Sequence, residues 1–119
     1  MARFLVCDDS AFMRMMLKRV LADLGHEVIA EASNGEEAVA MFRVLKPDIA
    51  TMDITMPKLD GIGALKAIRS EDQAAKIVMV TAIGQQAVIN EATEAGALDF
   101  IVKPFEPAQV AQIVKKILS

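Results

Sequence analysis

The segment that decides the fold is residues 4–10, which read FLVCDDS. Its first four residues are apolar, an unbroken run typical of a strand that is covered on both faces. Strands of this kind belong to parallel sheets with a layer of helices on each side. Two aspartates, Asp8 and Asp9, follow at the point where the strand should end. The segment therefore predicts an α/β fold with acidic side chains at one edge of the sheet.

Four more short apolar runs follow along the chain, at residues 28–32, 49–52, 77–81 and 100–102. The run at 28–32 is interrupted by Glu31, so we expect it to form an edge strand. Between the runs, apolar residues recur at three- and four-residue steps, the spacing of a helix with one buried face. Five such helices are expected, and residues that often begin or end helices mark their boundaries: Gly25, Asn34, Pro47, Gly96 and Pro107.

Strict alternation of strand and helix, five times over, implies a five-stranded parallel sheet with helices on both faces. Right-handed crossovers leave few topologies, and the flavodoxin-like strand order 2-1-3-4-5 is the commonest at this size. We expect a single domain over residues 1–119. In such sheets the functional groups gather beyond the carboxyl ends of the strands.

Composition narrows the classes of function. The chain has 119 residues, of which 54% are hydrophobic, so it can form one core and is not expected to be disordered. A net charge of −3 disfavours binding to nucleic acid. No apolar run could cross a membrane and no secretory signal opens the chain, so a soluble cytoplasmic protein is expected. The single cysteine, Cys7, is expected to be a reduced, buried thiol.

A polar residue stands at the end of every strand that should border a crevice at the carboxyl edge of the sheet. Asp8 and Asp9 follow the first strand, Asp53 the third, Thr81 ends the fourth and Lys103 follows the fifth. Taken singly, each has a simpler structural explanation, such as a helix cap, a turn or a solvated charge. Taken together they are harder to explain in that way, because the strand interiors are apolar. We therefore interpret them as one site.

These residue types favour a site for a hard divalent cation and a phosphoryl group. Three clustered carboxylates repel one another unless a cation lies among them. Oxygen ligands suit Mg²⁺, for which Mn²⁺ can substitute, rather than zinc. His26 lies elsewhere and is expected to be solvated, without a role. A carboxylate beside such a cation and a lysine can accept a phosphoryl group, and the Thr81 hydroxyl could donate to one of its oxygens.

The chain resembles the receiver domains of two-component response regulators in five positions: Asp8, Asp9, Asp53, Thr81 and Lys103. The resemblance covers the whole chain. Four segments are similar to single-domain chemotaxis regulators of the CheY type, in particular those of Gram-positive and thermophilic bacteria. These segments are residues 11–16, 51–57, 84–86 and 99–105.

The resemblance implies a role for each acidic residue. Asp53 would accept the phosphoryl group. Asp9 and Asp53 would bind Mg²⁺ through their side chains, Thr55 through its main-chain carbonyl group and Asp8 through water. A chemotaxis histidine kinase is the implied phosphoryl donor, a flagellar motor switch protein is the implied target, and a dedicated phosphatase is a further candidate partner. The protein would act as a monomer and would catalyse only its own phosphorylation and dephosphorylation.

The resemblance also implies a switch and an output face. Lys103 would assist the transfer, and its peptide bond to Pro104 would be cis. The output face would consist of the fourth helix, the fifth strand and the fifth helix. Its implied residues are Thr81, Phe100, Ile89 and Phe105, with Gln85 nearby. Ile89 is expected to be exposed. Phe100 stands where enteric regulators have a tyrosine, and Ile83 where an acidic residue is common.

The first helix carries four large apolar residues near its start. Met13 and Met16 fit its buried face, so we expect both in the core. Phe12 and Met15 fall outside that face and could contact a partner through exposed, adaptable surface.

Three alternatives remain at this point. A flavin or dinucleotide module would need a glycine-rich loop after the first strand, where Asp8 and Asp9 place two negative charges instead. A phosphatase with an aspartyl intermediate would need a second acid two residues after Asp53, where Thr55 stands. A phosphorelay carrier, or a receiver domain of a larger regulator, would have the same site.

Overall fold

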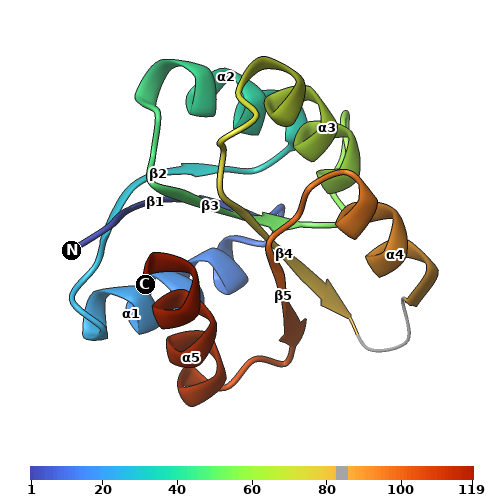
Figure 1. Cartoon of the computed structure of the whole chain (residues 1–119). Helices are drawn as coiled ribbons and strands as arrows, with labels where there is room; N and C mark the ends of the chain where they lie inside the picture. Colours follow the sequence, from blue (N-terminus) through green and yellow to red (C-terminus); the bar gives the residue numbers. More distant parts are fainter. Residues whose placement is uncertain (83–85) are drawn as a thin grey trace.

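The computed structural model describes residues 1–82 and 86–119, in which five strands alternate with five helices (Figure 1). The strands are β1 (Arg3–Cys7), β2 (Glu27–Ala32), β3 (Ile49–Asp53), β4 (Ile77–Ala82) and β5 (Asp99–Lys103). The helices are α1 (Ala11–Asp23), α2 (Gly35–Leu45), α3 (Gly61–Glu71), α4 (Gln86–Glu94) and α5 (Pro107–Leu118). The predicted alternation is confirmed, and every strand boundary lies within one residue of the prediction.

The five strands pair in parallel in the order β2-β1-β3-β4-β5. This is the predicted order, and β2, the strand interrupted by Glu31, lies at one edge. Figure 1 shows α1 and α5 on one face of the sheet and α2 and α3 on the other. Residues of α4 belong to the same core as those of α2 and α3. The carboxyl ends of all five strands therefore point to one edge of the sheet.

Both faces of the sheet are buried. Leu5 and Met52 lie in a core with Leu65 of α3. Phe4 and Val6 belong to a second core, on the side of α1 and α5. Because successive residues of a strand point to opposite faces, only a continuous apolar run can serve both cores. This explains the unbroken run at the start of the chain.

Capping residues and glycines set the ends of several helices. Within residues 1–82 and 86–119, three helices begin with a side chain that accepts a hydrogen bond from a main-chain N–H group of the first turn. These residues are Ser10 for α1, Asn34 for α2 and Asp60 for α3. Gly25 and Gly96, which follow α1 and α4, have φ angles of 87° and 108°. Glycine tolerates positive φ angles, so the helix ends predicted at Gly25 and Gly96 are confirmed. The helix start predicted at Asn34 is confirmed by its capping hydrogen bond.

Helix α1 is less deeply buried at its start than its sequence indicates. It packs on the sheet through Leu17 and Leu21. Phe12 and Met15 are exposed, as predicted. The prediction that Met16 belongs to the core is wrong, since this side chain is also exposed. Met16 precedes Leu17 by one residue and so lies about 100° away from it around the helix.

Three other single-residue predictions have mixed outcomes. His26 is not fully solvated, because it is half-buried and its Nδ1 atom accepts a hydrogen bond from the Ala2 N–H group at 3.0 Å. Ile89 is half-buried rather than exposed, since it lies three residues before the buried Ala92, on the same side of α4. Cys7 is a buried free thiol, as predicted, and burial raises its pKa strongly.

Candidate functional site

The predicted polar residues meet at the carboxyl edge of the sheet. Asp53 and Lys103 are the last residues of β3 and β5, and Asp8 directly follows β1. The Lys103 Nζ atom lies 3.0 Å from the Asp8 Oδ2 atom and 3.0 Å from the Asp53 Oδ2 atom. Lys103 thus joins two strand ends that are not neighbours in the sequence. The peptide bond between Lys103 and Pro104 is cis, as the resemblance implies.

Three carboxyl groups form a compact acidic pocket. One oxygen each of Asp8, Asp9 and Asp53 lies within 4.8 Å of the others. Asp8 and Asp53 are buried, whereas Asp9 is exposed, so the pocket opens to water on one side. All three groups offer oxygen atoms, and water can fill further coordination positions. Both properties fit Mg²⁺, which prefers oxygen ligands and usually keeps several of its waters.

The electrostatics of the pocket also favour a cation. Burial raises the pKa of Asp53, and the charge of Asp8 raises it further, while the hydrogen bond from Lys103 opposes both effects. Burial disfavours the charged form of Lys103, but hydrogen bonds to Asp53 and Asp8 outweigh it and raise the lysine pKa. Lys103 therefore remains protonated. Among the described residues, the pocket thus brings together three carboxyl groups and one lysine ammonium group, an arrangement that can receive a cation.

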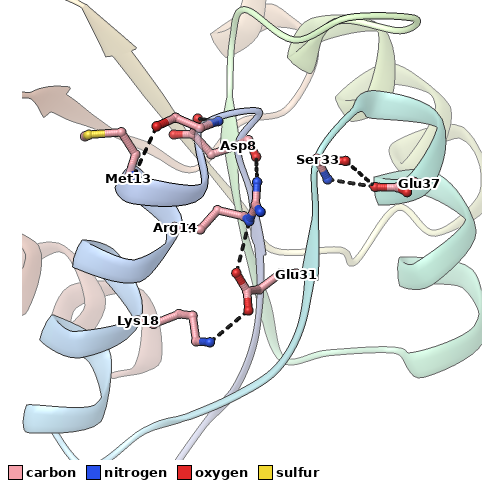
Figure 2. A network of polar contacts seen from close by, with 8 residues as sticks. Asp8, Met13, Arg14, Lys18, Glu31, Ser33 and Glu37 are labelled. Carbon is pink, nitrogen blue, oxygen red and sulfur yellow. Dashed lines mark hydrogen bonds and ion pairs between the residues drawn. The ribbon is translucent and has the colours of Figure 1, made fainter.

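Arg14 holds the loop that carries Asp8 and Asp9, a function that the sequence did not indicate. Its Nη1 atom donates to the main-chain carbonyl oxygen of Asp8 at 2.6 Å, and its Nε atom donates to the Glu31 carboxylate at 3.0 Å (Figure 2). The Asp8 carboxylate itself accepts a hydrogen bond from the N–H group of Ser10 at 2.9 Å. Both the main chain and the side chain of Asp8 are thus fixed.

The loop after β3 holds the other side of the pocket. The Thr55 N–H group donates to the Asp53 Oδ1 atom at 3.3 Å. The Gly61 N–H group donates to the Ile54 carbonyl oxygen at 2.8 Å, which brings the start of α3 against the end of β3. The Thr55 N–H group thus contacts Asp53, and the role of the Thr55 carbonyl group as a ligand stays a prediction. Gly61 is a second contributor that sequence reasoning missed.

The residues predicted to form the switch lie on one face of β4 and β5. Thr81 is buried and pairs with Val102, and its hydroxyl group donates to the Ala82 carbonyl oxygen at 3.2 Å. Phe100 lies two residues before Val102 in β5, so it shares a face of the sheet with Thr81. It is half-buried against the core beneath α2, α3 and α4.

The remaining predicted output residues are more scattered. Phe105 is half-buried against the core on the side of α1 and α5, so it lies on the opposite side of the sheet from Phe100. Ile89 lies in α4. Ile83 and Gln85 fall outside the described residues, and their predicted roles stay predictions.

Known proteins resemble this chain over almost its full length. Residues 4–115 match the model of the response regulator receiver domain. The chain is 55% identical to the chemotaxis protein CheY of Thermotoga maritima, over 97% of this chain and 96% of that protein. It is 51% identical to the chemotaxis protein CheY of Bacillus subtilis, over 98% of each. A chain of the CheX-CheY complex with BeF₃ and Mg²⁺ from Borrelia burgdorferi aligns with a TM-score of 0.93 and 37% identity, over 98% of this chain and 89% of that one.

Proposed function

The chain belongs to the response regulator receiver domain family, and from that premise we propose that it is a phosphorylation-activated chemotaxis regulator. Asp53 accepts a phosphoryl group from a histidine kinase, and the phosphorylated protein signals to the flagellar motor switch. One observation carries the proposal: the Lys103 ammonium group lies 3.0 Å from both Asp8 and Asp53, within a pocket of three carboxylates. A pocket with this charge distribution can receive a metal ion and a phosphoryl group together.

The chemistry is transfer of a phosphoryl group from nitrogen to oxygen. A carboxylate oxygen of Asp53 attacks the phosphorus atom of a phosphohistidine, the P–N bond breaks, and the imidazole leaves with the bonding electron pair. Lys103 stabilises the negative charge on the transferred oxygens, since it already touches Asp53 at 3.0 Å. Asp9, Asp53 and the Thr55 carbonyl group, with Asp8 acting through water, would hold Mg²⁺, which would supply further positive charge there. Mn²⁺ can substitute, because the ligands are all oxygen atoms.

The protein is a switch and not an enzyme that turns over an added substrate. It catalyses only its own phosphorylation and dephosphorylation. Thr55 supports this view, because a phosphatase with an aspartyl intermediate would need an acid at that position. Thr55 offers its N–H group to Asp53 and no carboxyl group.

The signal travels from Asp53 to the output face through Thr81. A phosphoryl group on Asp53 brings up to two negative charges and strong acceptor oxygens. Thr81 then turns its hydroxyl group from the Ala82 carbonyl oxygen to a phosphoryl oxygen, and Phe100 rotates into the space that Thr81 leaves. Because β5 is an edge strand, Phe100 on one face of the sheet, Phe105 on the other and Ile89 of α4 all flank this edge, which is the region that the motor switch protein reads.

The partners and location follow from the same proposal. The histidine kinase, the motor switch protein and a dedicated phosphatase are the partners, and the protein acts as a monomer in the cytoplasm. In the part of the chain that the structure describes, no helix is both long and apolar enough to cross a membrane. The acidic pocket and the net charge of −3 disfavour a nucleic acid as partner.

Phosphoryl transfer from a radiolabelled chemotaxis histidine kinase tests this function. The label should pass to this chain in the presence of Mg²⁺, and the labelled chain should bind a motor switch protein more tightly than the unlabelled chain does. The Asp53→Asn variant should do neither. Transfer of the label onward to a histidine of a second protein, without binding to the motor switch, would favour a phosphorelay carrier. Failure to take the label from any histidine kinase would contradict the proposal.

A further inference from the structure

One polar network beside the pocket is not used by the proposed chemistry. It joins α1 to the edge strand β2 and consists of Arg14, Lys18 and Glu31 (Figure 2). The Glu31 carboxylate accepts from the Arg14 Nε atom at 3.0 Å with one oxygen and from the Lys18 Nζ atom at 2.8 Å with the other. Arg14 is the least exposed member of the network, with 17% of its side-chain surface accessible.

Arg14 makes a contact that Lys18 does not. Its Nη1 atom donates to the main-chain carbonyl oxygen of Asp8 at 2.6 Å, the short distance of a bond from a charged donor. The Asp8 carbonyl group and the Asp9 N–H group belong to one planar peptide unit. The guanidinium group therefore fixes the orientation of the unit that joins two of the three carboxylates.

Glu31 anchors this contact to the sheet. It pairs with Val6 in β1, and the next residue of β2, Ala32, accepts a hydrogen bond from the Asp8 N–H group at 3.0 Å. Asp8 is thus tied to β2 twice, directly through its N–H group and indirectly through Arg14 and Glu31. Glu31, which interrupts the apolar pattern of β2, is therefore the residue that holds Arg14 in place.

We propose that Arg14, held by Glu31, is a positioning residue for the acidic pocket: it fixes the Asp8–Asp9 peptide unit in the geometry that binds Mg²⁺. The inference rests on the proposed function, because Mg²⁺ is the ligand in question. The charge of Arg14 and its positioning effect should change the Mg²⁺ affinity in opposite directions. A guanidinium group repels a cation, so its charge alone weakens Mg²⁺ binding, whereas its positioning effect strengthens it. The sign of the effect of substitution therefore separates the two explanations.

The test compares Mg²⁺ dissociation constants measured by isothermal titration calorimetry. The chain contains no tryptophan or tyrosine, so intrinsic fluorescence is a poor probe. Arg14→Met removes the positioning contact together with one positive charge. Lys18→Met is the matched control, since it removes one positive charge from the same Glu31 carboxylate but touches nothing in the pocket. Arg14→Lys keeps the charge and loses the planar fork that reaches Glu31 and Asp8 together.

Arg14→Met should weaken Mg²⁺ binding by about tenfold or more, the usual effect of removing a group that orients a metal ligand. Arg14→Lys should also weaken it, and Lys18→Met should leave it within about twofold of the parent. Amide NMR shifts of Asp9 and Ser10 should move in the Arg14 variants without metal. If Arg14→Met is unfolded by circular dichroism, Arg14→Lys decides the question.

Two outcomes would overturn the proposal. Equal or tighter Mg²⁺ binding by a folded Arg14→Met variant would show that the arginine acts through charge or stability alone. Parent-like binding by Arg14→Lys would show the same. These results differ from failure of the proposed function, in which the parent chain itself would neither bind Mg²⁺ nor accept a phosphoryl group.

Discussion

Gly61 lies directly against the main-chain carbonyl group of Asp53. A β-carbon at residue 61 would overlap the Asp53 carbonyl oxygen and would also press on Ile54, closer than real contacts allow. The Gly61 N–H group meanwhile donates to the Ile54 carbonyl oxygen at 2.8 Å. The first residue of α3 is therefore packed on the main chain of the proposed phosphoacceptor. The absence of a side chain at residue 61 is part of what sets the position of Asp53.

Gly61→Ala is accordingly expected to displace the end of β3. The free energy of unfolding should fall by about 1–3 kcal/mol, the usual cost of overpacking, and phosphorylation by acetyl phosphate should slow. Gly63→Ala is the matched control, because its β-carbon would meet the movable side chains of Leu59 and Asp60 rather than main chain. Urea denaturation followed by circular dichroism measures both. Parent-like stability and phosphorylation rate in Gly61→Ala would refute this account of the contact.

The sheet and its polar edge could be predicted because both depend on local pattern. Short apolar runs such as 4–7 and 77–81 predict the positions of the strands. The alternation with helices then leaves few possible strand orders. Asp53 and Lys103 could be assigned to one edge because strand ends in a parallel sheet share that edge. These inferences need no knowledge of which side chains touch.

The contacts that hold the pocket could not be predicted in this way. Arg14 reaches Glu31 across 17 residues of sequence, and nothing in the pattern of α1 distinguishes it from a solvated arginine. In the sequence, Gly61 looks like an ordinary glycine at the start of a helix. Only the structure shows that it lies against the main chain at the end of β3. The apolar stripe at the start of α1 predicts a buried Met16, and this is wrong because the sequence alone does not indicate the width of the buried face of the helix.

The stability of the metal-free protein should depend on the ionisation of Asp53. Because the pKa of Asp53 is raised in the folded state, chiefly by burial, the folded state loses stability as the pH rises through that pKa. Asp53→Asn removes this loss. In EDTA the variant should exceed the parent in free energy of unfolding at pH 7. The excess should shrink as the pH falls through the raised folded-state pKa of Asp53, and it should vanish below about 3.9, where Asp53 is protonated in both states. A difference that grows on acidification would contradict the assignment.

The Thr81 hydroxyl group should carry the signal without being needed for phosphorylation. Thr81→Ala should accept the phosphoryl group yet lose roughly ten- to a hundredfold of the phosphorylation-dependent gain in target affinity. This corresponds to a hydrogen bond to a charged acceptor, about 1.5–3 kcal/mol. Thr81→Ser keeps the hydroxyl group and should retain most of the gain. Equal affinity of phosphorylated Thr81→Ala and parent for the motor switch protein would rule out the coupling to Phe100.

The central claim, that Asp53 is the phosphoryl acceptor, is tested most directly by intact-protein mass spectrometry after incubation with acetyl phosphate and Mg²⁺. The parent should gain the mass of one phosphoryl group, and EDTA should suppress the gain. Asp53→Asn, shown to be folded by circular dichroism, should gain nothing, whereas Asp9→Asn should still be labelled, though more slowly, because it retains the acceptor. Labelling of Asp53→Asn at the rate and extent of the parent would contradict the account.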